Sequence, residues 1–183
     1  MIILDTNVVS EVLRPIPDNG VLAWLDSLSA TEVAITAITA AELSYGVRRL
    51  PEGRRRIELS EVIREIITSD FRDRIEPFDV RAADEYAEVV VERERSGQPI
   101  SKSDAQIAAI CRVHDAVLAT RNIPYHILGL PTPLKTTQLL YRSTSQTGKP
   151  TANVLSNTRR SISGSRALYT TLPAARVISS ITR

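Results

Sequence analysis

The sequence predicts an α/β fold in which a short, mainly parallel sheet is covered by helices. Over the first 120 residues, short runs rich in Ile and Val alternate with longer segments whose apolar residues have helical spacing. The length of 183 residues fits one domain with an appendage better than two domains. With 43% hydrophobic and 24% charged residues, the chain is not disordered throughout, so we expect a single core.

The first 68 residues contain two predicted strands and three predicted helices. Ile2-Ile3-Leu4 is too short and too β-branched for a buried helix, and it is typical of a central strand. Apolar residues recur with helical spacing from Asp18 to Leu28, and Pro51 and Gly53 separate two later helices. The predicted strands are 2–4 and 32–36, and the predicted helices are 18–28, 39–50 and 54–68.

The second half of the domain continues the alternation. A short strand stops near Pro77, and a loop is expected at Ser96-Gly97-Gln98-Pro99. The last helix has a regular apolar face that includes Cys111, the single cysteine, so we expect a buried, unreactive thiol. The predicted strands are 74–78 and 116–119, and the predicted helices are 80–95 and 101–114.

The composition changes sharply near residue 122. Residues 1–115 contain all 21 acidic residues and 14 of the basic ones, whereas residues 116–183 contain nine basic residues and no acid. Ser and Thr make up 15 of the last 41 residues, and prolines interrupt the segment. We therefore expect a folded domain at 1–122 and a basic, Ser/Thr-rich extension at 123–183 that is irregular and has no stable core.

Several classes of protein are excluded by composition. No apolar run approaches the roughly 18 residues that cross a bilayer, and the first five residues do not resemble an export signal, so we expect a cytoplasmic protein without a membrane partner. His114 and His126 lack metal-ligand spacing, and one cysteine cannot form a Cys-rich zinc site. Eight aromatic residues are too few for a base-stacking platform.

Acidic and amide side chains are predicted to meet at one edge of the sheet. Asp5 directly follows the first strand, and Thr120-Arg121-Asn122 follows the last one. Glu42 and Asp104 each fall in the first turn of a predicted helix. Ligands of open α/β sheets bind where strands end and helices begin, so we expect these side chains to share one pocket.

Carboxylates without neighbouring histidine or cysteine suit Mg²⁺ or Mn²⁺ better than zinc. Such an ion can stabilise charge on a phosphoryl group and lower the pKa of an attacking water, so hydrolysis of a nucleic-acid backbone is the natural reaction. A simpler interpretation remains open, because Thr39-x-x-Glu42 and Ser101-x-x-Asp104 both fit the capping box that closes a helix start. Asp5 alone is also typical of a turn, so only the joint pattern favours a metal site.

Four short motifs occur in order between residues 1 and 122. They are Ile3-Leu4-Asp5-Thr6-Asn7, Ala41-Glu42-Leu43, Ser103-Asp104-Ala105-Gln106-Ile107-Ala108-Ala109 and Leu118-Ala119-Thr120-Arg121-Asn122. Together they resemble the signatures of PIN-domain proteins, and most closely those of the VapC/FitB toxins of type II toxin–antitoxin systems. The resemblance covers about two-thirds of the chain.

This resemblance implies a three-layer α/β/α fold and a Mg²⁺-dependent endoribonuclease, with Mn²⁺ as a substitute ion, that a cognate antitoxin holds inactive and that commonly forms a homodimer. The implied metal-binding and catalytic acids are Asp5, Glu42 and Asp104. The resemblance further implies that Thr6 and Asn7 orient Asp5 and that Thr120 supports the site through its hydroxyl. It also implies Arg121 as a phosphate contact and Asn122 as a weak metal ligand. Arg121 could equally be an exposed, solubilising arginine. The segments 18–28 and 54–68 would contact a partner or simply cover the sheet.

The chain departs from the family pattern at two places. Relatives often have a fourth acid at the place of Asn122 or a few residues later, whereas this chain has Asn122-Ile123-Pro124-Tyr125, so a second metal should bind more weakly. Relatives usually continue with an Asp-Phe loop and a short closing strand, whereas this chain enters its basic extension, which would follow from an altered reading frame or from a segment that contacts RNA. The alternative function is therefore a catalytically impaired PIN-fold protein that still binds the antitoxin or nucleic acid. A phosphoaspartyl phosphatase is more distant, because Asn7 stands where such enzymes usually carry a second Asp.

Overall fold

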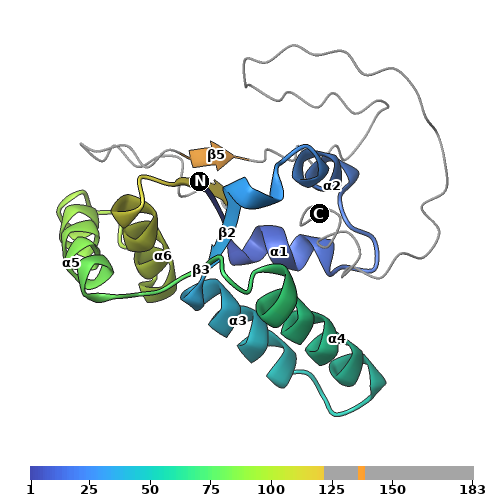
Figure 1. Ribbon diagram of the computed structural model, residues 1–183. Coiled ribbons are helices and arrows are strands. Elements are labelled where there is room, and N and C mark those ends of the chain that lie inside the picture. The colour runs from blue at the N-terminus through green and yellow to red at the C-terminus, as the bar shows by residue number, and fades with distance from the viewer. Residues whose placement is uncertain (122–135, 139–183) are drawn as a thin grey trace, which may run out of the picture.

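A parallel sheet of five short strands forms the centre of the fold (Figure 1). The computed structural model describes residues 1–121 and 136–138. All four strand pairs are parallel, and the strand order is β3-β2-β1-β4-β5. The strands are β1 (Ile2–Leu4), β2 (Val33–Thr36), β3 (Ile75–Glu76), β4 (Val117–Thr120) and β5 (Thr136–Gln138).

β1 lies in the middle of the sheet because it is apolar on both faces. Its residue Ile3 pairs with Ala34 of β2 on one side and Leu118 of β4 on the other. These three residues belong to the core on one face of the sheet, whereas Leu4 and Ala119 belong to the core on the opposite face. The period-two alternation of a strand therefore supplies both cores, and helices must cover both faces.

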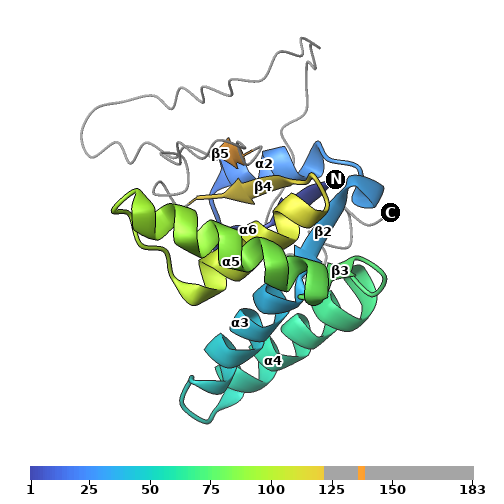
Figure 2. The same ribbon diagram turned by 90° about the vertical axis from the view of Figure 1, so that its left-hand side faces the viewer.

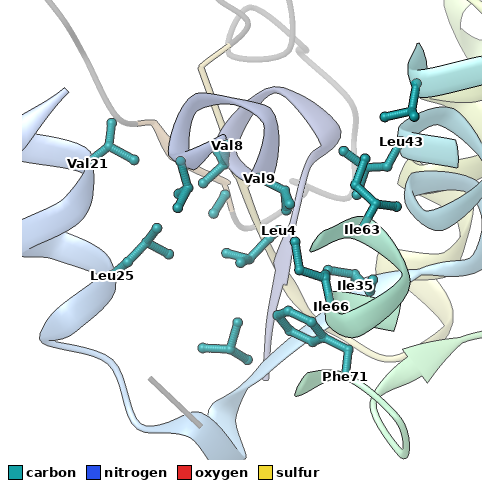
Figure 3. Packing of buried hydrophobic residues seen from close by; sticks show 14 residues of the cluster. Leu4, Val8, Val9, Val21, Leu25, Ile35, Leu43, Ile63, Ile66 and Phe71 are labelled. Carbon is teal, nitrogen blue, oxygen red and sulfur yellow. The ribbon is translucent and has the colours of Figure 1, made fainter. Parts of the chain in front are cut away.

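Four helices and a short π-helical turn cover the first face. Apolar side chains from each of these elements meet Leu4 and Ile35 in one cluster (Figure 3). Figure 1 shows these helices on the side of the sheet opposite α5 and α6. The elements are α1 (Thr6–Val12), α2 (Asn19–Asp26), α3 (Ala37–Arg48), α4 (Arg54–Glu65) and the π-helical turn η2 (Ile66–Asp70); a 3₁₀ turn, η1 (Ala30–Glu32), precedes β2.

Two long helices cover the second face. α5 (Val80–Arg95) and α6 (Lys102–Val113) lie side by side (Figure 2), and Glu92 of α5 accepts a 2.6 Å charged hydrogen bond from Arg112 of α6. Cys111 is fully buried among α6 residues that face the sheet, as predicted from its position in the apolar pattern. The architecture is thus the three-layer α/β/α arrangement that the sequence predicts.

Several element boundaries differ from the prediction. α1 was absent from the prediction because its seven residues are too few for a clear apolar period. α3 begins at Ala37, where Thr36 rather than Thr39 caps the first turn by accepting the Thr39 N–H at 2.9 Å. The third strand has two residues, and the α-helix at 54–68 passes into the π-helical η2 after Glu65.

A fifth strand was also missed. β5 pairs in parallel with β4, with Thr137 opposite Ala119. Its polar sequence Thr-Thr-Gln lacks the apolar alternation that predicts a strand. The strand is identified only by its pairing with β4. Apart from this strand, the predicted extension at 123–183 lies outside the described residues.

The two amphipathic segments proposed for partner contact both cover the sheet. Val21 and Leu25 of α2 and Ile63 of α4 are buried in the first core. A partner for the remaining surface of these helices stays a prediction. Of the helices that the structure describes, none combines the length and the apolar character needed to span a membrane.

Candidate active site

Three hydrogen-bond donors hold the carboxylate of Asp5. Asp5 follows β1, caps α1 and is only 5% exposed. Its Oδ1 accepts the backbone N–H of Thr6 at 2.7 Å, and its Oδ2 accepts the Thr120 hydroxyl and the Asn7 amide, each at 2.6 Å. Asp5 therefore serves both as a helix cap and as an oriented carboxylate at the end of the central strand.

Asn7 connects the ends of the two central strands. Its Nδ2 donates to Asp5 after β1 and, at 3.0 Å, to the hydroxyl of Thr120 at the end of β4. Its Oδ1 accepts the backbone N–H of Arg121 at 2.9 Å. The same amide thus holds Asp5 and the chain after β4 in one arrangement, and Thr120 is fully buried beside it.

Glu42 reaches the site from α3 but not from its first turn. It is the sixth residue of the helix, so the expected first-turn position was wrong, since Thr36 caps the helix three residues earlier than predicted. The capping-box interpretation of Thr39 and Glu42 fails for the same reason. Instead, the hydroxyl of Thr6 donates to Glu42 Oε2 at 2.5 Å, so Thr6 orients Asp5 through its N–H and Glu42 through its side chain.

Asp104 lies in the first turn of α6, as predicted. Ser101 caps this helix by accepting the Asp104 N–H at 3.1 Å, which is half of a capping box. Within the described ranges, no hydrogen bond or ion pair involves the Asp104 carboxylate. This half-buried carboxylate is therefore available for a ligand.

The three acids line a single pocket of about 410 Å³. Burial raises the pKa of Asp5, hydrogen bonds from Thr120 and from the Thr6 N–H oppose this shift, and the negative charges of Asp104 and Glu42 raise the pKa further. Asp5 thus interacts electrostatically with each of the other two carboxylates. The other residues lining it are Thr6, Asn7, Ser10, Glu11, Arg14 and Arg121.

The donor set of this pocket suits a hard divalent cation. All three acids offer carboxylate oxygens, and a cation would relieve their mutual repulsion. In the part of the chain that the structure describes, no group of three or more Asp, Glu, His or Cys side chains is placed so that it could hold a metal ion, so the three acids line the pocket without converging on one ion position. Mg²⁺ usually takes one or two carboxylates and keeps several waters, so the pocket fits this ion without a complete protein cage.

Arg121 and Glu11 also line the pocket and pair with each other. Arg121 donates through Nη1 to Glu11 Oε2 and its side chain is 21% exposed, so it is not the freely exposed arginine of the alternative interpretation. Glu11 was missed because α1 was not predicted. Its spacing from Asn7 and Arg14, at four and three residues, is the signal that an expected helix would have revealed. Asn122 lies outside the described residues.

Comparison with known proteins assigns the folded part of the chain to a family. The PIN domain matches residues 2–123. The chain belongs to the PIN-domain family. It is 43% identical over 122 residues to the toxin FitB of Neisseria gonorrhoeae, covering 67% of this chain and 88% of FitB.

The family assignment is also supported by a second relative and by a solved structure. This PIN-domain protein is 37% identical over 131 residues to the VapC ribonuclease Y4jK of Sinorhizobium fredii, covering 71% of this chain and 94% of Y4jK. A structure of FitAB bound to a DNA fragment aligns with a TM-score of 0.64 at 43% identity, covering 67% of this chain and 85% of the other. The resemblance to the VapC/FitB proteins inferred from the motifs is confirmed.

Proposed function

We propose that this PIN-domain protein is a Mg²⁺-dependent endoribonuclease toxin. The observation that carries the proposal is that Asp5, Glu42 and Asp104, from three separate elements, line one pocket, where the other two acids act electrostatically on Asp5. The names of the ribonuclease Y4jK and the toxin FitB support the same activity class. The reaction is hydrolysis of an RNA phosphodiester bond.

The chain's own residues prepare the pocket for this reaction. A bound Mg²⁺ or Mn²⁺ ion would stabilise negative charge on the phosphoryl group and lower the pKa of a water. Asn7, Thr120 and the Thr6 N–H keep Asp5 oriented as a metal ligand, and the Thr6 hydroxyl keeps Glu42 beside it. Asp104 supplies the third carboxylate, and Asn122 is retained as a weak additional ligand.

A cognate antitoxin is the proposed protein partner, with a homodimer as the proposed assembly and the cytoplasm as the proposed location. FitAB was solved as a complex on DNA, and this chain matches it at 43% identity over 67% of its length. An antitoxin that occludes the pocket would keep RNA away from the three acids.

The proposal is tested by RNA cleavage with Mg²⁺ and with a chelator. We expect Mg²⁺-dependent cleavage that is lost in Asp5→Asn and in Asp104→Asn, because each change removes one of the carboxylates. Asp26→Asn is the matched control, since it makes the same substitution at an exposed position of α2 and should leave cleavage unchanged. Cleavage that survives both active-site substitutions would reject the assigned site.

The alternative function, a catalytically impaired binding protein, predicts a different result. Titration calorimetry with Mg²⁺ on the wild type and on Asn122→Asp distinguishes the two. Metal binding together with RNA turnover in the wild type excludes the impaired protein, whereas metal binding and turnover that appear only in Asn122→Asp establish it.

A further inference from the structure

The polar face of α1 continues beyond the three acids. Its pocket-lining side chains are spaced by three or four residues, whereas the three valines of the helix point into the core. This face begins beside Asp5 and ends just after the helix. The residues of α1 and of the turn after it that line the pocket are Thr6, Asn7, Ser10, Glu11 and Arg14.

Glu11 is a buried carboxylate with three donors. It is 3% exposed, and its Oε2 accepts Nη1 of Arg121 as well as Nη1 of Arg14 at 3.0 Å. Its Oε1 accepts the backbone N–H of Asp18 at 3.1 Å. A buried charge needs such partners. Glu11 also positions two guanidinium groups in the lining of the pocket.

The pocket lining contains two differently charged groups of residues. Asp5, Glu42 and Asp104 supply three carboxylates, whereas Arg14 and Arg121 against Glu11 leave one net positive charge. Glu11 follows Asp5 by six residues, which corresponds to a rise of about 9 Å along a helix axis. Because its carboxylate pairs with two arginines, Glu11 belongs with the basic group and not with the three acids.

We propose that Arg14 and Arg121, positioned by Glu11, form a phosphate subsite that binds the RNA backbone next to the phosphate being cleaved. This inference rests on the proposed function. The Arg14 side chain is 62% exposed and retains donors for a ligand, and a guanidinium group matches the geometry of phosphate oxygens. Arg121 is also tied to Asn7 through its N–H, so the subsite is coupled to the group that orients Asp5.

The first experiment measures binding without cleavage. A fluorescein-labelled 2′-O-methyl oligoribonucleotide of mixed sequence is titrated with the full chain in a chelator, and anisotropy is followed between about 50 and 200 mM salt. The slope of log K against log salt is negative. For Arg14→Ala, we expect this slope to become less steep by about 0.7, the value for one lost contact to a single strand. Arg55→Ala, which removes the same charge from an exposed position of α4, is the control and should keep the wild-type slope.

Glu11→Gln separates a positioning residue from a simple charge. Removing a negative charge should strengthen binding if only net charge matters. Because Glu11 orients both arginines, we expect instead about twofold or greater weakening, with the circular dichroism spectrum unchanged. Equal or tighter binding by the folded variant would overturn the positioning role, and because Arg14 is exposed, Arg14→Ala tests the subsite even if Glu11→Gln does not fold.

Failure of this inference is distinguishable from failure of the proposed function. If the wild type cleaves RNA and Arg14→Ala has the wild-type salt slope, the subsite is rejected and the nuclease stands. If the slope becomes less steep in Arg14→Ala but not in Arg55→Ala while the wild type cleaves no RNA, the subsite binds nucleic acid backbone and the proposed reaction is rejected.

Discussion

Asp70 should make the stability of this protein depend on pH. It is the last residue of η2, is only 8% exposed, and its Oδ2 has no hydrogen-bond partner among the described residues. Burial raises the pKa of Asp70 from 3.8 to about 6, the charge of Glu65 adds to the shift, and Arg74 opposes it. Arg74 compensates only in part because it donates to the backbone carbonyls of Ala30, Val33 and Asp70 itself.

The sign of the effect follows from proton binding. Below about pH 4, Asp70 is protonated in the folded and the unfolded chain and costs nothing. Between pH 4 and pH 6 the unfolded chain loses this proton first, so the free energy of unfolding falls as pH rises. Above pH 6 the full cost is present, and the rise of the Asp70 pKa from 3.8 to about 6 corresponds to a cost of up to about 3 kcal/mol.

Asp70→Asn removes this titration. Urea unfolding of the metal-free chain from pH 4 to pH 7.5 should show that the variant gains up to about 3 kcal/mol over the wild type at pH 7 and little at pH 4. Asp73→Asn, an exposed substitution three residues away, is the matched control and should follow the wild type. A difference between Asp70→Asn and wild type that is the same at every pH would refute the reasoning.

Three further outcomes are expected. Thr120→Val removes the 2.6 Å hydrogen bond to Asp5, which raises the pKa of Asp5 further. Calorimetry should show that this variant binds Mg²⁺ about 10- to 100-fold more weakly, whereas Thr120→Ser should bind Mg²⁺ as the wild type does. Ile107→Ala opens a cavity in the fully buried core between α6 and the sheet, so urea unfolding should reveal a loss of about 2–5 kcal/mol. Burial raises the pKa of the Cys111 thiol, so iodoacetamide should label this residue only after denaturation; rapid labelling of the native chain would contradict the packing of α6.

Local sequence was enough to predict most of the architecture. The central strands have β-branched runs, and α2, α5 and α6 have apolar residues at helical spacing. Both patterns follow from burial, because buried positions recur at regular intervals along the sequence. The positions of Asp5 after β1 and Asp104 in the first turn of α6 followed from the same patterns. Elements without a period were missed, namely the short helix α1 and the polar strand β5.

Contacts between distant segments were decided only by the tertiary structure. Thr6 donates to a carboxylate 36 residues away, and Thr120 to one 115 residues away, and neither distance leaves a mark on local composition. The environment of Glu11 could not be predicted for the same reason, because its partner Arg121 follows β4 and lies 110 residues away in the sequence. The sequence alone therefore determined which residues are apolar, which caps are available and which acids exist. The packing of helices α3 and α6 against the paired strands determined which of those acids line one pocket, because tertiary contacts bring residues together across any length of intervening chain.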